Sequence, residues 1–193
     1  MTLRDEALFI GGRSGVGKSS VGHEIHAQLS ATRVGHCLIE GDNLDQAYPV
    51  PWEHGHRLAE QNLAAIWANY RALGYRRMIY TNTASVFPDI VAELTAAMGG
   101  EPEVTAILLT CDDRTARHRL AQREIGSMLD WHVHRSTAMA RELDEQVPDT
   151  VHRVVTDGRT VADIAAEIIS IAGWKADREL PAAARPDFDG PKI

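Results

Sequence analysis

One motif near the start of the chain constrains the fold more than any other feature of the sequence. Residues 12–19 read GRSGVGKS and fit the pattern G-x-x-x-x-G-K-[ST] of a phosphate-binding loop. A short apolar run at 7–10 precedes the motif, and Val21, Ile25 and Leu29 recur at helical spacing after it. The sequence therefore predicts a strand, a glycine-rich loop and a helix in succession, which is the setting that this motif requires.

The residue types in this loop are those that a nucleotide triphosphate needs. Glycines let the backbone bend tightly and approach the phosphate oxygens, because no Cβ intervenes. The following helix directs its free N–H groups and positive dipole end at the anion. Lys18 adds a charge for the β- and γ-phosphates, and the Ser19 hydroxyl is a ligand for Mg²⁺. We therefore expect ATP and Mg²⁺ to bind here, with the following residues in contact with the nucleotide: Gly12, Arg13, Ser14, Gly15, Val16, Gly17, Lys18, Ser19 and Ser20.

Apolar runs with the length of strands alternate with helical patterns along the rest of the chain, which favours an α/β fold. The predicted strands cover 7–10, 36–39, 76–80, 104–110 and 152–156. The predicted helices follow the loop and then cover 57–73, 90–98, 114–123, 133–146 and 161–172. We expect a three-layer P-loop NTPase with a five-stranded parallel sheet and helices on both faces. One domain at 1–174 and a tail with little structure at 175–193 complete this prediction.

Composition narrows the class of protein. The chain has 193 residues and a formal charge of -7, which gives no sign of a nucleic-acid surface. No apolar run approaches the roughly 20 residues that a membrane span needs, and charged residues at 4–6 argue against a signal peptide. We expect a cytoplasmic monomer or homodimer. Cys37 and Cys111 lack metal-ligand spacing and are expected to be buried free thiols.

Two carboxylates, Glu40 and Asp42, follow the second predicted strand. Ligands of open parallel sheets bind beyond the carboxyl ends of the strands, so these side chains face the predicted site. An alcohol that attacks the γ-phosphate loses a proton, and Asp42 could accept it as a general base or orient Mg²⁺ through water. Glu40 is the supporting partner, and the sequence does not rank the two. The alternative is a polar turn in which Asp42 caps the next segment.

The third strand ends in Thr81 and Asn82, where a hydrolytic motor has an Asp that holds Mg²⁺. A motor is therefore disfavoured, and these side chains could contact an acceptor instead, although they could equally form a polar strand end. Together with the proline-rich segment after the second strand, they predict an acceptor site around 42–57 and 81–85. Side chains that could line it are Tyr48, Trp52, His54 and Arg57, with a solvated loop as the alternative for the histidines.

An arginine-rich helix follows the fourth strand. Arg119 and Arg123 are four residues apart and share one helix face. Guanidinium groups suit the charge that spreads over a transferring phosphoryl group, so we expect both to close over the γ-phosphate. A helix break at 124–127 and a second helix predict a lid at about 114–146. The alternative is a solvated helix face on which the arginines pair with neighbouring carboxylates.

These motifs resemble the small P-loop kinases of the adenylate, shikimate, gluconate and adenylylsulfate kinase group. Within it, the chain is similar to the chloramphenicol phosphotransferases and the tunicamycin-resistance ATP-binding proteins. Residues 40–43 are similar to the D-G-D-N of adenylylsulfate kinases, with Glu40 in place of the first Asp, and the resemblance implies that Asp42 lies beside the acceptor hydroxyl. The turn 157–160 resembles the one near the adenine, which implies that Arg159 contacts the nucleotide. The arginine that adenylylsulfate kinases carry after this motif is missing from 43–46, so the acceptor stays open.

The leading functional hypothesis is an ATP-dependent phosphotransferase that moves the γ-phosphate to a hydroxyl of a small molecule. The acceptor is a metabolite or an antibiotic in this hypothesis. The alternative is a nucleotide-dependent binding protein that sequesters its ligand with little turnover. A regulatory GTPase is disfavoured, because the chain has no N-K-x-D guanine signature.

Overall fold

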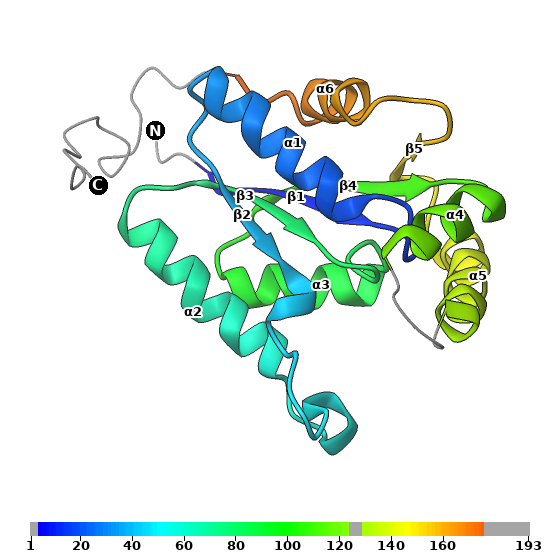
Figure 1. Ribbon diagram of the computed structural model, residues 1–193. Coiled ribbons are helices and arrows are strands. Elements are labelled where there is room, and N and C mark those ends of the chain that lie inside the picture. The colour runs from blue at the N-terminus through cyan, green and yellow to red at the C-terminus, as the bar shows by residue number, and fades with distance from the viewer. Residues whose placement is uncertain (1–3, 124–128, 176–193) are drawn as a thin grey trace, which may run out of the picture.

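The computed structural model describes residues 4–123 and 129–175 (Figure 1). The predicted helix break at 124–127 and the predicted tail beyond 175 lie outside these residues, and so does the side chain of Arg123. None of the helices in the described ranges is long and apolar enough to cross a membrane.

Five parallel strands form one sheet in the order β2–β3–β1–β4–β5. They are β1 (Glu6–Gly11), β2 (Cys37–Glu40), β3 (Arg77–Thr81), β4 (Glu103–Thr110) and β5 (His152–Val155). The predicted five-stranded parallel sheet is thus confirmed. Because β1 pairs with β3 on one side and with β4 on the other, the loop that follows β1 lies at the centre of the carboxyl edge of the sheet.

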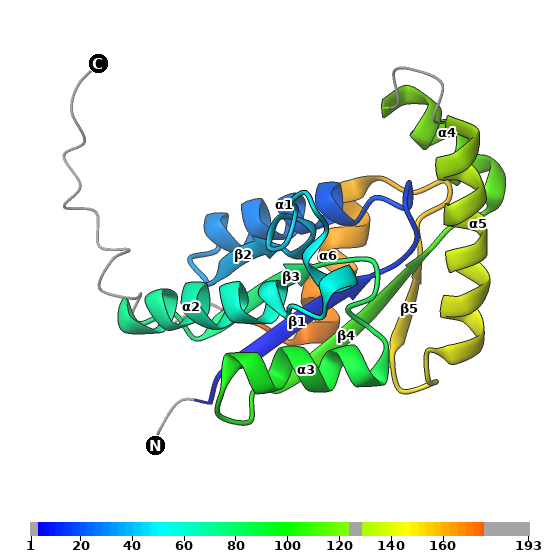
Figure 2. The same ribbon diagram turned by 90° about the horizontal axis from the view of Figure 1, so that it is seen from below.

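Helices cover both faces of the sheet, as Figures 1 and 2 show. One face carries α1 (Lys18–Ala31) and α6 (Val161–Ala172), and the other carries α2 (Leu58–Ala72) and α3 (Pro88–Met98). The alternation of side chains along β1 explains the layers, because successive residues of a strand point to opposite faces. Leu8 and Ile10 pack beneath α1 and α6, whereas Phe9 packs against α2 and α3.

The periodic apolar positions of the helices form the core, as the sequence predicts. Val21, Ile25 and Leu29 of α1 are each no more than 1% exposed and pack on the sheet. Trp67 lies on the apolar stripe of α2, is 1% exposed, and belongs to the core of the opposite face. A hydrophobic stripe at helical spacing was therefore sufficient to place these helices.

Two further helices stand at one end of the molecule, beyond β4 and β5 (Figure 2). These are α4 (Asp113–Arg123) and α5 (Leu129–Gln146). The first described residues of α5 lie before the predicted start at 133; the additional turn contains Asp130, whose charge is favourable at a helix N-terminus. Between β2 and α2 the chain forms only two short 3-10 turns, Gly41–Asn43 and Pro51–His54. The prolines at 49 and 51 explain why no regular helix forms there.

Candidate functional site

The phosphate-binding loop has the backbone that its glycines allow. Gly12, Gly15 and Gly17 have φ angles of 140°, 84° and 109°, a region that residues with a Cβ rarely occupy. Space is also short: a Cβ on Gly12 would lie 2.6 Å from the Leu109 carbonyl oxygen. A Cβ on Gly15 would lie 2.8 Å from the carbonyl oxygen of Ala116. The loop is therefore packed tightly against the end of β4 and against α4.

The start of α1 is open to an anion. Gly17 is the N-cap residue, no side chain caps the helix, and the first turn holds no acidic residue. The Lys18 ammonium donates hydrogen bonds to the carbonyl oxygens of Gly12, at 2.8 Å, and Arg13, at 3.3 Å, so that its charge lies over the loop. Ser19 is in the first turn and is partly exposed. Free backbone N–H groups, a positive dipole end and a cation thus converge on one concave loop.

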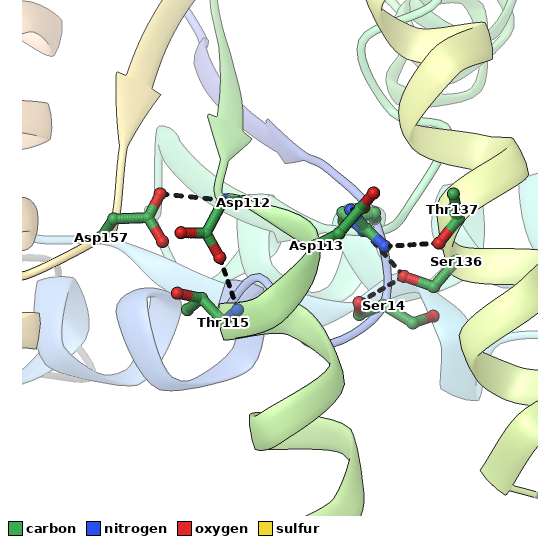
Figure 3. A network of polar contacts seen from close by, with 8 residues as sticks. Ser14, Asp112, Asp113, Thr115, Ser136, Thr137 and Asp157 are labelled. Carbon is green, nitrogen blue, oxygen red and sulfur yellow. Dashed lines mark hydrogen bonds and ion pairs between the residues drawn. The ribbon is translucent and has the colours of Figure 1, made fainter.

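The Arg13 side chain connects the loop to α4 and α5. It is 4% exposed, and its Nε donates a 2.8 Å hydrogen bond to the Ser136 hydroxyl. Its two terminal nitrogens donate to Asp113 and to the Thr137 hydroxyl. The Ser136 hydroxyl in turn donates to the carbonyl oxygen of Ser14 at 2.8 Å (Figure 3). The Arg13 side chain is therefore occupied by contacts with α4 and α5, and its predicted contact with nucleotide stays a prediction.

A second group of contacts joins the ends of β4 and β5 to α4 (Figure 3). The Asp112 carboxylate accepts a hydrogen bond from the Thr115 backbone N–H and so caps α4. This bond, followed by the one from the Thr115 hydroxyl, lowers the pKa of Asp112. The Asp112 backbone N–H donates to Asp157 Oδ2 at 3.1 Å. Asp157 begins the turn that carries Arg159, so this turn is bonded to the residue that precedes α4.

Arg119 and Arg159 line a cavity of about 270 Å³ beside the outer side of the loop. Arg119 donates hydrogen bonds to the Val16 carbonyl oxygen at 2.9 Å and to the Thr156 hydroxyl at 3.0 Å. Arg159 forms an ion pair with Glu167 at 2.6 Å. The structure thus brings Arg119 and Arg159 to one cavity, which the loop residues Gly15 and Gly17 also line. The guanidinium of Arg119 bonds to Val16 and to Thr156, the residue after β5. Its predicted position over the γ-phosphate therefore stays a prediction.

Asn82 links the loop to the predicted acceptor carboxylate. Its backbone N–H donates to Ile10 at the end of β1, and the next residue, Thr83, accepts a 3.2 Å hydrogen bond from the Gly12 N–H. The Asn82 amide donates a 2.6 Å hydrogen bond to Asp42 Oδ1. The ends of β1, β2 and β3 are therefore held together by one residue. The sequence predicted two equal roles for Asn82, contact with an acceptor or a polar strand end, and did not predict its hydrogen bond to Asp42.

Glu40 and Asp42, which the sequence left unranked, have different surroundings. Asp42 is exposed and is oriented by the Asn82 amide. Glu40 is partly buried; its Oε1 is 3.5 Å from His23 Nδ1 and accepts no hydrogen bond within residues 4–123 and 129–175. His23 Nδ1 itself donates to the Ser19 carbonyl oxygen at 2.8 Å, which places Glu40 near the first turn of α1. Asp42 is therefore the carboxylate that a ligand can reach from solvent.

A larger cavity of about 560 Å³ opens beside Asn82, and we call it the Tyr80 cavity. It lies between the ends of β2 and β3, the start of α2 and the side of α3. Its lining residues are Gly41, Asp45, Trp52, Gly55, His56, Arg57, Leu58, Ala59, Glu60, Tyr80, Asn82, Ala84, Ile90, Glu93 and Leu94. Trp52 and Arg57, which the sequence placed at the acceptor site, lie here. Tyr48 is 97% exposed and His54 lines a separate cavity, so neither is among the lining residues.

Tyr80 was not predicted as a site residue, because it belongs to an apolar strand. Only 3% of its surface is exposed, and its ring packs edge-on against Phe9. Its hydroxyl forms no hydrogen bond to any residue in the described part of the chain, yet the residue lines the cavity. Gly41 makes room for it, since a Cβ there would lie 2.3 Å from the Tyr80 hydroxyl oxygen. A tyrosine followed by a polar strand end was the signal that could have identified it.

Metal-ligating and thiol chemistry is sparse in the described residues. No group of three or more histidines, cysteines, aspartates or glutamates within 4–123 and 129–175 is arranged to hold a metal ion. Both cysteines are free thiols; Cys37 is buried as predicted, and Cys111 is only half-buried. Burial raises the pKa of the Cys37 thiol to about 12, so it stays protonated at neutral pH.

The fold is shared with solved structures of P-loop kinases. No model of a known protein family matches the chain, and no curated protein matches it. The structure of a tunicamycin resistance protein from Deinococcus radiodurans matches at a TM-score of 0.62 and 18% identity, over 90% of this chain and 99% of that one. A gluconokinase from Sinorhizobium meliloti 1021 matches at 0.59 and 19%, over 87% and 91%. An APS kinase from Mycobacterium tuberculosis, in complex with AMPPNP and APS, matches at 0.54 and 17%, over 88% and 98%.

At such identities the likeness is one of fold alone. It confirms, at the level of fold, the resemblance to small P-loop kinases that the motifs indicated.

Proposed function

We propose that this protein is an ATP-dependent phosphotransferase that moves the γ-phosphate to a hydroxyl group of a small molecule. The observation that carries this proposal is the position of Asn82. One residue is hydrogen-bonded both to the strand that leads into the phosphate-binding loop and to Asp42, and it lines the Tyr80 cavity. A nucleotide site, a carboxylate and a cavity therefore meet at one edge of the sheet, where open parallel sheets bind their ligands.

The proposed reaction uses these three parts in a defined order. An acceptor in the Tyr80 cavity directs its hydroxyl toward the loop, and the hydroxyl oxygen forms a bond to the γ-phosphorus. The bond between that phosphorus and the β,γ-bridging oxygen breaks, and ADP leaves with the bridging oxygen. The hydroxyl proton passes to the Asp42 carboxylate and from there to solvent. Asn82 keeps this carboxylate oriented, and Lys18 compensates the negative charge on the phosphates.

Residues of the loop also fit Mg²⁺, which usually binds to one or two protein oxygens, substrate phosphates and water rather than to an all-protein cage. The partly exposed Ser19 hydroxyl and the Asp42 carboxylate would hold it, Asp42 through water. When bound, Mg²⁺ neutralises charge on the β- and γ-phosphates.

A screen for acceptor-dependent ADP release tests the proposal. The purified chain is incubated with ATP, Mg²⁺ and single members of a panel of hydroxylated metabolites and antibiotics. ADP is measured by a coupled assay, and phosphorylated products by mass spectrometry. We expect at least one compound to raise ADP release and to gain one phosphate. Lys18→Ala is the blank for contaminating kinases, because the loop cannot function without this cation.

A different result would support the sequestration hypothesis. In that case ATP and a panel compound bind to the chain, as isothermal titration shows, but ADP release stays at the level of the Lys18→Ala blank. The proposed phosphotransfer would then be wrong. The exposed Asp42 beside the cavity is the observation that favours turnover over sequestration.

A further inference from the structure

Carboxylates outnumber cationic groups around the Tyr80 cavity. Asp45, Glu60 and Glu93 line it, and Arg57 is the one lysine or arginine among its lining residues. The lining therefore has a formal charge of −2 when His56 is neutral. Asp42, held by the lining residue Asn82, adds a further negative charge at the end that faces the loop.

Arg57 is already engaged by two of these carboxylates. Its Nη2 lies 3.2 Å from Glu93 Oε2 and 3.7 Å from Glu60 Oε1. An acceptor with a carboxylate or a sulfate would have to displace these partners to reach the guanidinium. It would also approach Asp45 and the two glutamates, which together carry one negative charge more than Arg57 compensates. The charge of the lining thus disfavours an anionic acceptor.

Tyr80 offers a ligand a polar group in this cavity, and this observation is independent of the charge count. Only 3% of the residue is exposed, its hydroxyl forms no hydrogen bond within residues 4–123 and 129–175, and the hydroxyl oxygen is not among the fully buried unpaired atoms of these residues, so this oxygen opens into the cavity. Burial, followed by the charges of Asp42, Asp45 and Glu60, raises its pKa well above the ordinary value. The hydroxyl therefore stays protonated and can bond to a polar group of a ligand, and the three carboxylates act on the same place.

We infer that the Tyr80 cavity selects a small hydroxylated compound that carries a protonated amine, such as an amino sugar or an aminocyclitol. Asp45 and Glu60 bind the ammonium group, and the Tyr80 hydroxyl bonds to a neighbouring polar group of the ring. The indole of Trp52, which is 64% exposed, offers a face for the cation at the rim. This substrate class rests on the proposed phosphotransfer function and makes it more specific.

Binding to a charge-matched set of compounds tests the inference. Glucosamine is cationic, N-acetylglucosamine is neutral, gluconate is anionic, and 2-deoxystreptamine carries two amines. Each is titrated calorimetrically into the full chain with AMPPNP and Mg²⁺ at pH 7. We expect the amines to bind about 10-fold more tightly than N-acetylglucosamine, with gluconate weakest, and we expect the preference to shrink at high salt.

Two substitutions should change this preference in opposite directions. Asp45→Asn should reduce the ratio of amine to neutral affinity by about 3- to 5-fold, and Arg57→Gln should increase it. The matched control is Asp149→Asn, because Asp149 is exposed in the turn between α5 and β5, at the sheet edge opposite β2. This control should leave the ratio unchanged.

The inference is overturned if neutral or anionic compounds bind as well as the amines, if no amine binds, or if Asp45→Asn leaves the ratio unchanged. The proposed function fails separately. If amines bind with the expected charge preference but no ADP is released, the proposed phosphotransfer is wrong and the inferred ligand class stands. If neutral or anionic acceptors release ADP at least as fast as the amines do, phosphotransfer stands and the inferred ligand class is wrong.

Discussion

The phosphate-binding loop presents the backbone of consecutive residues, whereas the Tyr80 cavity is lined by residues of β3, α2, α3 and the connections between β2 and α2 and between β3 and α3. In the loop, Gly12, Gly15 and Gly17 hold positive-φ conformations that glycine adopts readily. In the cavity, Arg57 meets Glu93, and Asn82 meets Asp42, across large separations in the chain. The nucleotide half of the candidate site is therefore formed by one short sequence motif. The acceptor half is formed by residues that are distant in the chain and meet only in the folded protein.

This difference predicts how the two halves respond to mutation. A change in the loop should remove nucleotide binding and with it all turnover. A change in the cavity should leave nucleotide binding intact and affect only the acceptor. Four variants, ordered from the largest expected effect to the smallest, test whether the halves separate in this way.

Lys18→Ala should have the largest effect. The ammonium lies over the loop through its bonds to Gly12 and Arg13, and its loss removes the charge that compensates the phosphates. We expect turnover to fall by about 10²- to 10³-fold, together with weaker ATP binding in calorimetry. Lys175→Ala, at an exposed residue after α6, is the matched control. Normal ATP turnover by Lys18→Ala would contradict the assignment of the loop.

Asp42→Asn should leave ATP affinity unchanged and lower phosphoryl transfer by about 10²-fold, because the amide cannot accept the proton. The assay is single-turnover transfer to an acceptor from the screen. Glu40→Gln is the comparison variant, since Glu40 is the second carboxylate at this strand end. If Glu40→Gln loses transfer and Asp42→Asn does not, the base is Glu40.

Arg13→Met tests whether the loop and the lid form one unit. The variant removes the hydrogen bonds to Ser136 and Thr137 and the ion pair with Asp113, and Ser136 is 2% exposed. We expect the free energy of unfolding in urea to fall by about 2 kcal/mol. Arg117→Met is the control: Arg117 is 62% exposed, lies 3.6 Å from Asp130, and should change stability by less than about 0.5 kcal/mol. Equal effects of the two variants would show that the Arg13 contacts do not stabilise the lid.

Tyr80→Phe should have the smallest effect and the most selective one. Its hydroxyl has no partner among the described residues, so its removal should change the free energy of unfolding by less than about 0.5 kcal/mol. Acceptor affinity should fall by about 5-fold, the loss of one hydrogen bond, while ATP affinity stays the same. Tyr70→Phe, at a tyrosine outside the cavity lining, should change neither affinity. A purely structural Tyr80 would instead lower stability and leave acceptor affinity unchanged.

Much of the fold could be predicted from the sequence because its signals are local. The apolar runs identified all five strands, and the periodic positions Val21, Ile25 and Leu29 identified the buried face of α1. The first turn of α5 was missed, because its apolar residues Leu129 and Trp131 are two positions apart and do not follow helical spacing. The strand order could not be derived from these runs, because each run is equally compatible with several neighbours in a parallel sheet.

By itself, the sequence determined the phosphate-binding loop, since eight consecutive residues fix both its backbone and its chemistry. It also identified Asp42 as a carboxylate at a strand end. Only the tertiary structure decided that the Arg13 side chain contacts α5 and that Tyr80 lines a cavity. The physical reason is that a glycine loop is shaped by its own torsion angles. A side chain's role in a cavity depends on which distant elements pack beside it, and residue type alone does not specify those neighbours.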